Sequence, residues 1–168
     1  MSLLKILNYP DSRLYKVASK VEVFDTKIKT IVNNMAETMY QAKGIGLAAT
    51  QVDFHKKIIV IDISKDKDSL VVLINPELIE SSGIQNIEEG CLSVPGIYEK
   101  VERYKNIRVK AFNINGKEFE IKAEGLLAVC IQHEMDHLEG KVFVEYLSLL
   151  KKDRIKKKLI KKNKQSNV

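Results

Sequence analysis

The sequence predicts an α+β fold, in which mostly antiparallel β-sheets surround a central helix. Several strand-like runs precede one strongly apolar helix, without the regular strand-helix alternation that indicates a parallel sheet. The pair Asn115-Gly116 joins two of these runs and is a typical hairpin turn. An amphipathic N-terminal helix and a basic C-terminal helix flank this region, so the class is α+β.

The N-terminal helix is expected from Asp25, a favoured N-cap residue, to about Ala42. Its apolar residues recur every three or four positions, which predicts one buried face. They are Ile28, Ile31, Val32, Met35 and Met39. The strand-like runs that follow are residues 57–63, 70–74, 98–103, 107–114 and 118–123. The polar stretch 64–69 is expected to be a surface loop.

The central helix is expected from about Gly125 to Leu138, with Gly140 as its stop signal. Its residues before position 132 are mostly apolar. It then carries His-Glu-Met-Asp-His at 133–137, an H-E-x-x-H pattern. Histidines four positions apart project from one face of a helix and can share a divalent metal.

Glu134 would lie beside that metal rather than on it. A carboxylate there can take a proton from a water that the metal has acidified, which indicates metal-assisted hydrolysis. The alternative is that His133 and His137 are hydrogen-bonded core residues. Three polar groups in an apolar helix are costly to bury unless something satisfies them, and a metal would do so.

A catalytic metal site needs a third protein ligand. The protease pattern H-E-x-x-H-x-x-G-x-x-H fails at Phe143, where its third histidine would stand, and His55 is expected in a solvated loop. Cys130 lies seven residues from His137, about 10 Å along the helix axis, whereas metal-ligand bonds are about 2.0 to 2.3 Å. Cys91 lies in a segment that contains glycine and proline residues. It can complete a Cys-His-His ligand set that leaves the fourth coordination position of the metal open.

Three segments carry a family resemblance, namely GIGLAATQ at 44–51, EGCLS at 89–93 and QHEMDHL at 132–138. In order and spacing the chain resembles the bacterial peptide deformylases, from residue 4 to about residue 147. The resemblance implies an enzyme that removes the formyl group from the N-terminal formyl-methionine of nascent polypeptides. It implies Fe²⁺ as cofactor, or Zn²⁺, Ni²⁺ or Co²⁺ in its place, with Cys91, His133 and His137 as metal ligands.

The resemblance also implies roles for residues around the substrate. The side-chain amide of Gln51 and the backbone N–H of Leu92 would stabilise the charge on the formyl oxygen, while Glu134 would move the proton. The implied substrate-binding residues are Ile45, Gly46, Ile87, Glu89, Gly90, Leu126, Val129 and Cys130. Five of them (Ile45, Ile87, Leu126, Val129 and Cys130) would line an apolar methionine pocket, although each could equally be a plain core residue.

The chain departs from the family pattern at Tyr98, where many relatives carry an arginine that helps to hold the peptide. The resemblance therefore does not imply that contact in this chain. Arg103 is retained, and we hypothesise that it pairs with Glu89 as a brace behind the Cys91 loop.

The chain of 168 residues has the size of a single domain, 1–168, with a basic helix or tail over about 148–168. Residues 151–168 carry a net charge of +8, and the rest of the chain carries −2. A solvated charge run is one interpretation; attraction to a polyanion is the other. The resemblance implies docking on ribosomal RNA near the exit tunnel.

Two cysteines without an expected disulfide favour a cytoplasmic protein, and no presequence or membrane span is visible. We expect a monomer with neither membrane nor DNA as partner. Two rival functions stay open. One is an H-E-x-x-H metallopeptidase, and the other is a basic ribosome-associated binding protein with a structural metal.

Overall fold

The computed structural model describes residues 2–166, with side chains described up to residue 162. Five strands form one antiparallel sheet in the order β1-β2-β3-β4-β5, which confirms the α+β class. The strands are β1 (Gly46–Ala48), β2 (Ile58–Ile61), β3 (Val71–Cys91), β4 (Val94–Phe112) and β5 (Glu118–Glu124). The helices are α1 (Thr26–Gln41), α2 (Gly125–Leu138) and α3 (Leu149–Ser166), with short 3-10 turns at Ser12–Tyr15, Ala49–Val52 and Phe143–Tyr146. The sequence suggested several sheets, but the described strands form one continuous sheet.

The strands β3 and β4 are far longer than predicted, at 21 and 19 residues. The predicted run 70–74 is only the beginning of β3, and the runs 98–103 and 107–114 both belong to β4. Pro76 and the polar residues after it looked like the end of a strand. Register shifts between Ile74 and Glu77 and between Leu78 and Glu80 allow the pairing to continue past that proline. Cross-strand pairing therefore outweighed the local sequence signal.

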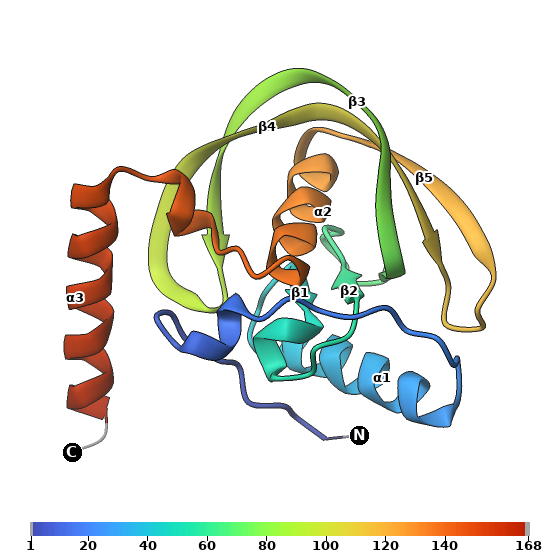
Figure 1. Cartoon of the computed structure of the whole chain (residues 1–168), viewed down its shortest axis with the longest axis horizontal. Helices are drawn as coiled ribbons and strands as arrows, with labels where there is room; N and C mark the ends of the chain where they lie inside the picture. The colour runs from blue at the N-terminus through green and yellow to red at the C-terminus, as the bar shows by residue number, and fades with distance from the viewer. Residues whose placement is uncertain (1, 167–168) are drawn as a thin grey trace.

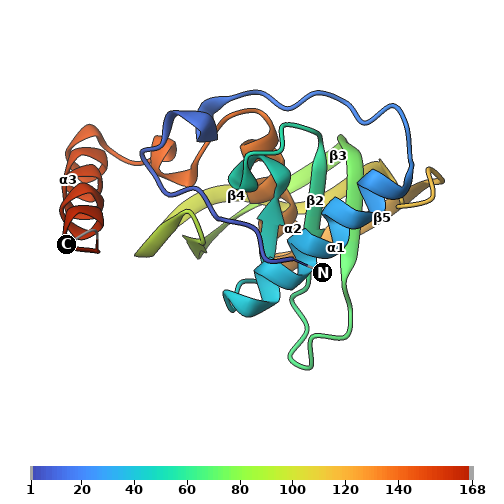
Figure 2. The same cartoon turned by 90° about the horizontal axis from the view of Figure 1, so that it is seen from below.

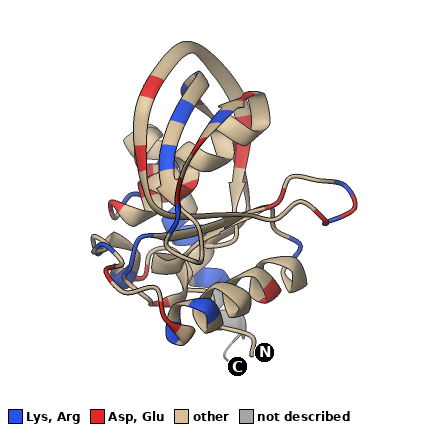
Figure 3. Ribbon diagram, turned by 90° about the vertical axis from the view of Figure 1, so that its right-hand side faces the viewer, with Lys and Arg blue, Asp and Glu red and all other residues tan. Residues whose placement is uncertain are grey.

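The long β3 and β4 hairpin bends into an arch over α2 (Figure 1). Positively and negatively charged residues are spread along these strands (Figure 3). Arg108 of β4, for example, pairs with Glu80 of β3 at 2.6 Å and with Glu120 of β5 at 3.0 Å. The outer surface of the arch is thus solvated, while its inner surface encloses α2.

The helices α1 and α2 cover opposite faces of the short strands (Figure 2). All four residues of β2 are fully buried, because alternate side chains of a strand point to opposite faces. Ile58 and Val60 pack with the α1 residues, whereas Ile59 and Ile61 pack with the α2 residues. The α2 helix is consequently enclosed by protein on most sides.

The α1 helix begins directly after Asp25, whose carboxylate accepts a hydrogen bond from the Ile28 N–H at 3.1 Å. Its buried face contains Ile28, Val32, Met35 and Met39, while Ile31 is partly buried. The left-handed turn that follows, with φ of 60° at Lys43, leads the chain into Gly44 and β1. This turn fixes where β1 begins.

The α3 helix stands to one side of the sheet (Figure 1). Ile155 and Leu159 pack against a cluster that includes Leu7, Tyr9 and Phe143. Leu149 and Leu150, at the beginning of the helix, are exposed. Residues 167–168 of the predicted tail lie outside the described residues. Across residues 2–166, no helix has the length and apolar character needed to cross a membrane.

We predict that Met35→Ala lowers the free energy of unfolding by about 2 to 5 kcal/mol, because it leaves a cavity at a fully buried position between α1 and the sheet. Urea denaturation measures this change. The matched control is Val23→Ala, at a side chain that is 66 % exposed, which should change stability by less than about 0.5 kcal/mol. Equal losses in the two variants would contradict this packing.

Candidate metal centre

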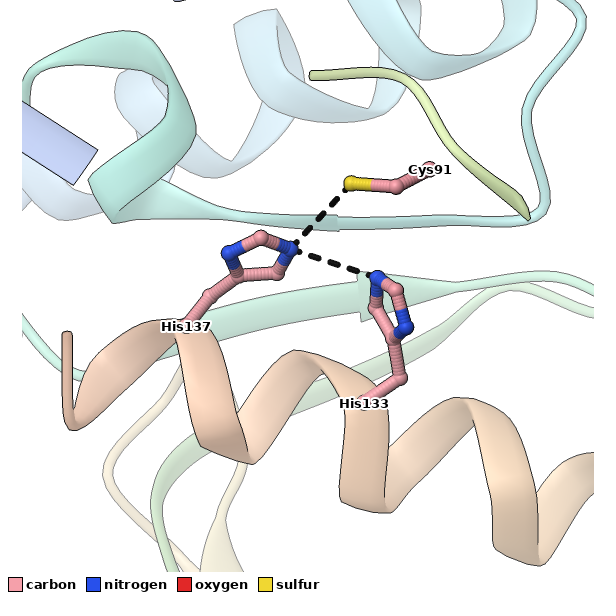
Figure 4. Close-up of side chains that lie close together, drawn as sticks. All are labelled: Cys91, His133 and His137. Atoms are coloured by element: carbon pink, nitrogen blue, oxygen red, sulfur yellow. Dashed lines mark hydrogen bonds between the residues drawn. The ribbon is translucent and has the colours of Figure 1, made fainter. Parts of the chain in front are cut away.

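Three metal-binding side chains converge between the end of β3 and the buried face of α2. Figure 4 shows Cys91 from β3 pointing at His137 and His133, which lie one turn apart on α2. The Cys91 Sγ lies 3.4 Å from His137 Nε2, and that nitrogen lies 3.2 Å from His133 Nε2. All three ligand atoms lie within 4.8 Å of one another. Ligands on a tetrahedral metal at bond lengths of about 2.0 to 2.3 Å stand about 3.3 to 3.6 Å apart, so this set fits one divalent ion.

The buried polar atoms beside this cluster also fit a metal centre. His137 is fully buried and Glu134 is 4 % exposed. His137 Nδ1 and Glu134 Oε1 find no hydrogen-bond partner among the described residues. Burial raises the pKa of Glu134 to about 7. A carboxyl group that titrates near neutrality can both accept and return a proton, as a general acid-base group must.

Gly46 of β1 makes room for the Glu134 carboxylate. A Cβ atom at position 46 would collide with Glu134 Oε2, so any side chain there would displace the carboxylate. The second glycine of the GIGLAATQ segment is thus required by a close approach between β1 and α2. This contact links the first sequence segment physically to the third.

Glu89 contacts His133, one of the candidate metal ligands, on the side away from the cluster. Its Oε1 lies 2.8 Å from His133 Nδ1, and an imidazole that donates from Nδ1 presents Nε2 to the metal. Arg103 donates to Glu89 from Nε at 2.8 Å and from Nη2 at 3.0 Å, so the hypothesised pairing is present. Burial by itself would raise the pKa of Glu89, but hydrogen bonds from His133 and Arg103 outweigh it and hold that pKa below its usual value.

The brace continues to the protein surface through two residues that the sequence reasoning missed. Arg103 Nη1 donates to Asp136 at 2.5 Å, and the Tyr146 hydroxyl donates to the same carboxylate at 2.8 Å. The Arg103 guanidinium also lies 5.0 Å from the centre of the Tyr146 ring. The sequence feature that could have indicated a role for Asp136 is its place in the H-E-x-x-H pattern, three residues after His133. No local sequence feature indicated a role for Tyr146.

Gln51 places its amide next to the cysteine. Its Nε2 donates to Ser93 Oγ at 3.0 Å and lies 3.5 Å from Cys91 Sγ, while its Oε1 accepts from the Ala48 N–H at 2.9 Å. Leu92 is partly buried beside Gly44, where an added Cβ would collide with the leucine side chain. The structure therefore brings Gln51 and Leu92 to the same cluster.

A cavity of about 530 Å³ opens onto this cluster. Seven of the eight expected substrate-binding residues line it, and they are Ile45, Gly46, Glu89, Gly90, Leu126, Val129 and Cys130. Ile87 is half-buried and is not among the lining residues. Cys130 belongs to the wall and not to the ligand cluster, and burial raises the pKa of its thiol to about 12. Its assignment as an apolar residue near the site agrees with this position.

His55 takes no part in the centre. Its Nε2 lies 3.1 Å from the backbone oxygen of Arg13, and its Nδ1 lies 3.7 Å from an Asp53 carboxylate oxygen. Phe143 stands where the protease pattern would place a third histidine. It is buried, with its ring centroid 5.9 Å from that of His133, so it packs against a candidate metal ligand.

Comparison with known proteins agrees with this geometry. The sequence model of the polypeptide deformylase family matches residues 3–153. The chain is 63 % identical to peptide deformylase 2 of Nitrosomonas europaea over 161 residues, which cover 96 % of this chain and 87 % of that protein. It is 58 % identical to the peptide deformylase of Chromobacterium violaceum, over 99 % of both chains.

Solved structures show the same fold. The crystal structure of a peptide deformylase from Legionella pneumophila superposes with a TM-score of 0.95 at 48 % identity, covering 99 % of this chain and 98 % of that one. The family match spans most of the chain, and the relatives are similar over nearly its full length. The chain therefore belongs to the polypeptide deformylase family.

Proposed function

We propose that this chain is a metal-dependent hydrolase that removes the N-formyl group from the N-terminal formyl-methionine of newly made proteins. The products are formate and a free amino terminus. The observation that carries the proposal is the buried cluster of Cys91, His133 and His137, with Glu134 beside it and an open cavity in front of it. Membership of the deformylase family supports the same activity.

The metal ligands in this proposal are Cys91, His133 and His137. A divalent cation held by them supplies Lewis acidity, which makes water a stronger acid and a carbonyl carbon a better electrophile. Thiolate and imidazole ligands suit Fe²⁺, which we propose as the native ion, and also Zn²⁺, Ni²⁺ and Co²⁺. The thiolate distinguishes this ligand set from that of an ordinary H-E-x-x-H protease.

Glu134 acts as the proton shuttle. Its carboxylate takes a proton from the attacking water, and the resulting hydroxide adds to the formyl carbon. Glu134 then gives the proton to the departing amine nitrogen, so that the carbon-nitrogen bond breaks without forming an amide anion. A pKa near 7 suits both halves of this cycle.

Gln51 and Leu92 stabilise the formyl oxygen as negative charge builds on it. The Gln51 amide is held in place by hydrogen bonds to Ser93 and Ala48, so it needs no reorganisation during the reaction. The Leu92 backbone N–H is the second donor that we assign. Preorganised donors of this kind are worth about 3 to 4 kcal/mol each in a water-excluded site.

The substrate peptide adds to the free edge of β1. In the described sheet, β1 is an edge strand whose neighbour is β2, and the Asp62 N–H donates to Ile45 O at 2.8 Å. Backbone groups in an antiparallel pair alternate in direction, so those of Gly46 point away from β2 and are available to a peptide. Main-chain pairing ignores side chains, which suits substrates that share only their first residue.

The methionine side chain enters the apolar part of the cavity. Its walls include Ile45, Leu126, Val129 and Cys130. Ile87, Glu89 and Gly90 complete the proposed set of substrate-binding residues, with Glu89 acting through His133 rather than through a free carboxylate. Tyr98 lies over Gly90 and lines the same cavity, so it replaces the arginine of many relatives with an aromatic wall.

We further propose that residues 1–168 form one catalytic domain that works as a monomer in the cytoplasm. Both cysteines are free, with Cys91 at the metal cluster and Cys130 buried, which suits a reducing compartment. The exposed lysines of α3 would dock on ribosomal RNA. Ile155 and Leu159 attach this helix to the domain, which leaves its basic side chains facing outward.

We predict that the anaerobically purified protein releases formate from formyl-Met-Ala-Ser and does not cut an internal peptide bond. Glu134→Gln should lower kcat by about 10² to 10⁴-fold, because the shuttle is lost while the shape is kept. Metal content, measured by mass spectrometry, should stay unchanged. The control is Glu139→Gln, at the exposed end of the same helix, which should remain active. Loss of metal in Glu134→Gln would instead make Glu134 a ligand.

We predict that Arg103→Ala weakens metal binding by about 10 to 100-fold in competition with a chelator, because Glu89 then no longer holds His133 in place. Arg108→Ala is the matched control, since its ion pairs with Glu80 and Glu120 lie on the surface, and it should bind metal as the unaltered protein does. Unchanged metal affinity and activity in Arg103→Ala would show that the brace is irrelevant.

We predict that neutralising α3 weakens ribosome binding and makes it less sensitive to salt, because fewer counterions are released on binding. Deleting the helix would also remove Ile155 and Leu159 from the core, so substitutions of exposed lysines are the cleaner test. The variant is Lys156→Gln, Lys158→Gln and Lys161→Gln together, and the control is Lys20→Gln, Lys27→Gln and Lys117→Gln. Cosedimentation over a salt series measures both, and equal binding by the two triple variants would contradict the proposal.

A further inference from the structure

We propose that Lys43 makes this enzyme favour formylated peptides with an acidic side chain at the second or third residue. This inference rests on the proposed deformylase function and adds a charge preference beyond the methionine. Two features support this preference. One is the direction in which a bound peptide must run from the metal centre along the cavity, and the other is the set of charged residues beside that path.

The cavity has a reacting end and an exit end. The reacting end is marked by Glu134 in contact with Gly46, and by Gln51 next to the Cys91 sulfur. The formyl group must lie there, because that is where the metal ligands and the proton shuttle meet. The other end is marked by Ala42, Lys43 and Gly44, which line the same cavity before β1 begins.

The peptide therefore runs from Gly46 back toward Lys43, antiparallel to β1. Lys43 lies three positions before Gly46, so the two are at most about 10 Å apart. An extended peptide covers that distance in about three residues. If the methionine lies opposite residues 45 and 46, the next one or two residues lie beside Gly44 and Lys43.

The backbone holds Lys43 in a fixed place at this exit. Its N–H donates to Tyr40 O at 3.0 Å and the Gly44 N–H donates to Met39 O at 3.0 Å, which closes the C-terminus of α1. Lys43 itself has φ of 60°, the left-handed conformation common at such a terminus. Its exposed side chain lines the cavity, and among the described residues it has no ion-pair partner.

Other charged residues lie along the cavity and in the neighbouring loop. Glu88 also lines the cavity, and its register partner on β4 is Lys100. The loop between β2 and β3, which projects from the molecule in Figure 2, carries Lys65, Asp66, Lys67 and Asp68. With Asp62 at its start the loop carries a net charge of −1, but the Asp62 carboxylate is buried and accepts hydrogen bonds from Tyr40 and Ser64. Among the described residues that line the cavity, Lys43 is the one lysine or arginine, so an acidic substrate side chain beside it would meet an exposed positive charge.

The expected effect is modest and acts on binding. An exposed ion pair changes affinity by no more than about 5-fold, and it is screened by salt. Because the contact is far from the formyl carbon, it should be equally strong in the bound substrate and in the transition state. The preference should then appear in KM and not in kcat.

The test is formate release, at low and high salt, from formyl-Met-Ala-Asp, formyl-Met-Ala-Ala and formyl-Met-Ala-Lys, and from the corresponding peptides with the charge at the second residue. In at least one series the unaltered protein should show the lowest KM for the Asp peptide and the highest for the Lys peptide, with steps of about 2 to 5-fold. The preference should shrink at high salt.

Variants at position 43 assign the preference to this side chain. Lys43→Gln should flatten the series and Lys43→Glu should reverse it. Lys29→Glu makes the same charge change on an exposed face of α1 and should keep the original order. It thereby separates a local contact from the net charge of the protein.

The outcomes distinguish the two proposals. If no formyl peptide releases formate, the deformylase function itself fails. If formate is released equally from the acidic, neutral and basic peptides of both series at low salt, the charge preference is overturned. If the order persists in Lys43→Gln and Lys43→Glu, a preference exists but Lys43 does not cause it, and the inference is again overturned.

Discussion

The ion pair between Arg103 and Glu89 is the interaction on which the rest of the site depends. Both side chains are almost fully buried, and removing one would leave an uncompensated charge in the interior. Glu89 is also the partner of His133, so the same carboxylate neutralises the arginine and orients a candidate metal ligand. The strand β4 supplies Arg103, β3 supplies Glu89 and α2 supplies His133. One network thus fixes three elements relative to one another.

The bent hairpin is the second requirement for this site. Cys91 lies 42 residues before His133, and its sulfur must come within a few ångströms of two imidazoles on a helix that forms later in the chain. The arch of β3 and β4 over α2 does this, because the end of β3 returns to the helix face that carries the histidines (Figure 1). A flat sheet would leave the thiolate far from the helix. The unusual length of these strands therefore has a functional consequence.

Much of the site could be predicted from local sequence because its parts lie in short segments. His133, Glu134 and His137 share a helix face by periodicity. The three-histidine protease site was excluded because Phe143 stands at the third histidine position, and Cys130 was excluded as a metal ligand by its distance from His137 along the helix axis. The strand ends could not be predicted in this way. Pro76 and the polar run after it resemble a break, and only pairing with β4 shows that β3 continues through a register shift. The single sheet, in place of several, follows from the same long-range pairing.

The sequence by itself determined the chemistry, since two histidines and a glutamate on one apolar helix, with one suitable cysteine elsewhere, admit few ligand sets. Tertiary structure decided how these groups are held. Tyr146 and Asp136 extend the brace of Glu89 to the surface, and Gly46 is kept small by the Glu134 carboxylate. Ile87, expected in the methionine pocket, is not among the residues that line the cavity. The reason is physical. Ligand identity depends on side-chain chemistry, which each residue carries with it, whereas hydrogen-bond partners and close approaches depend on residues that only long-range packing brings together.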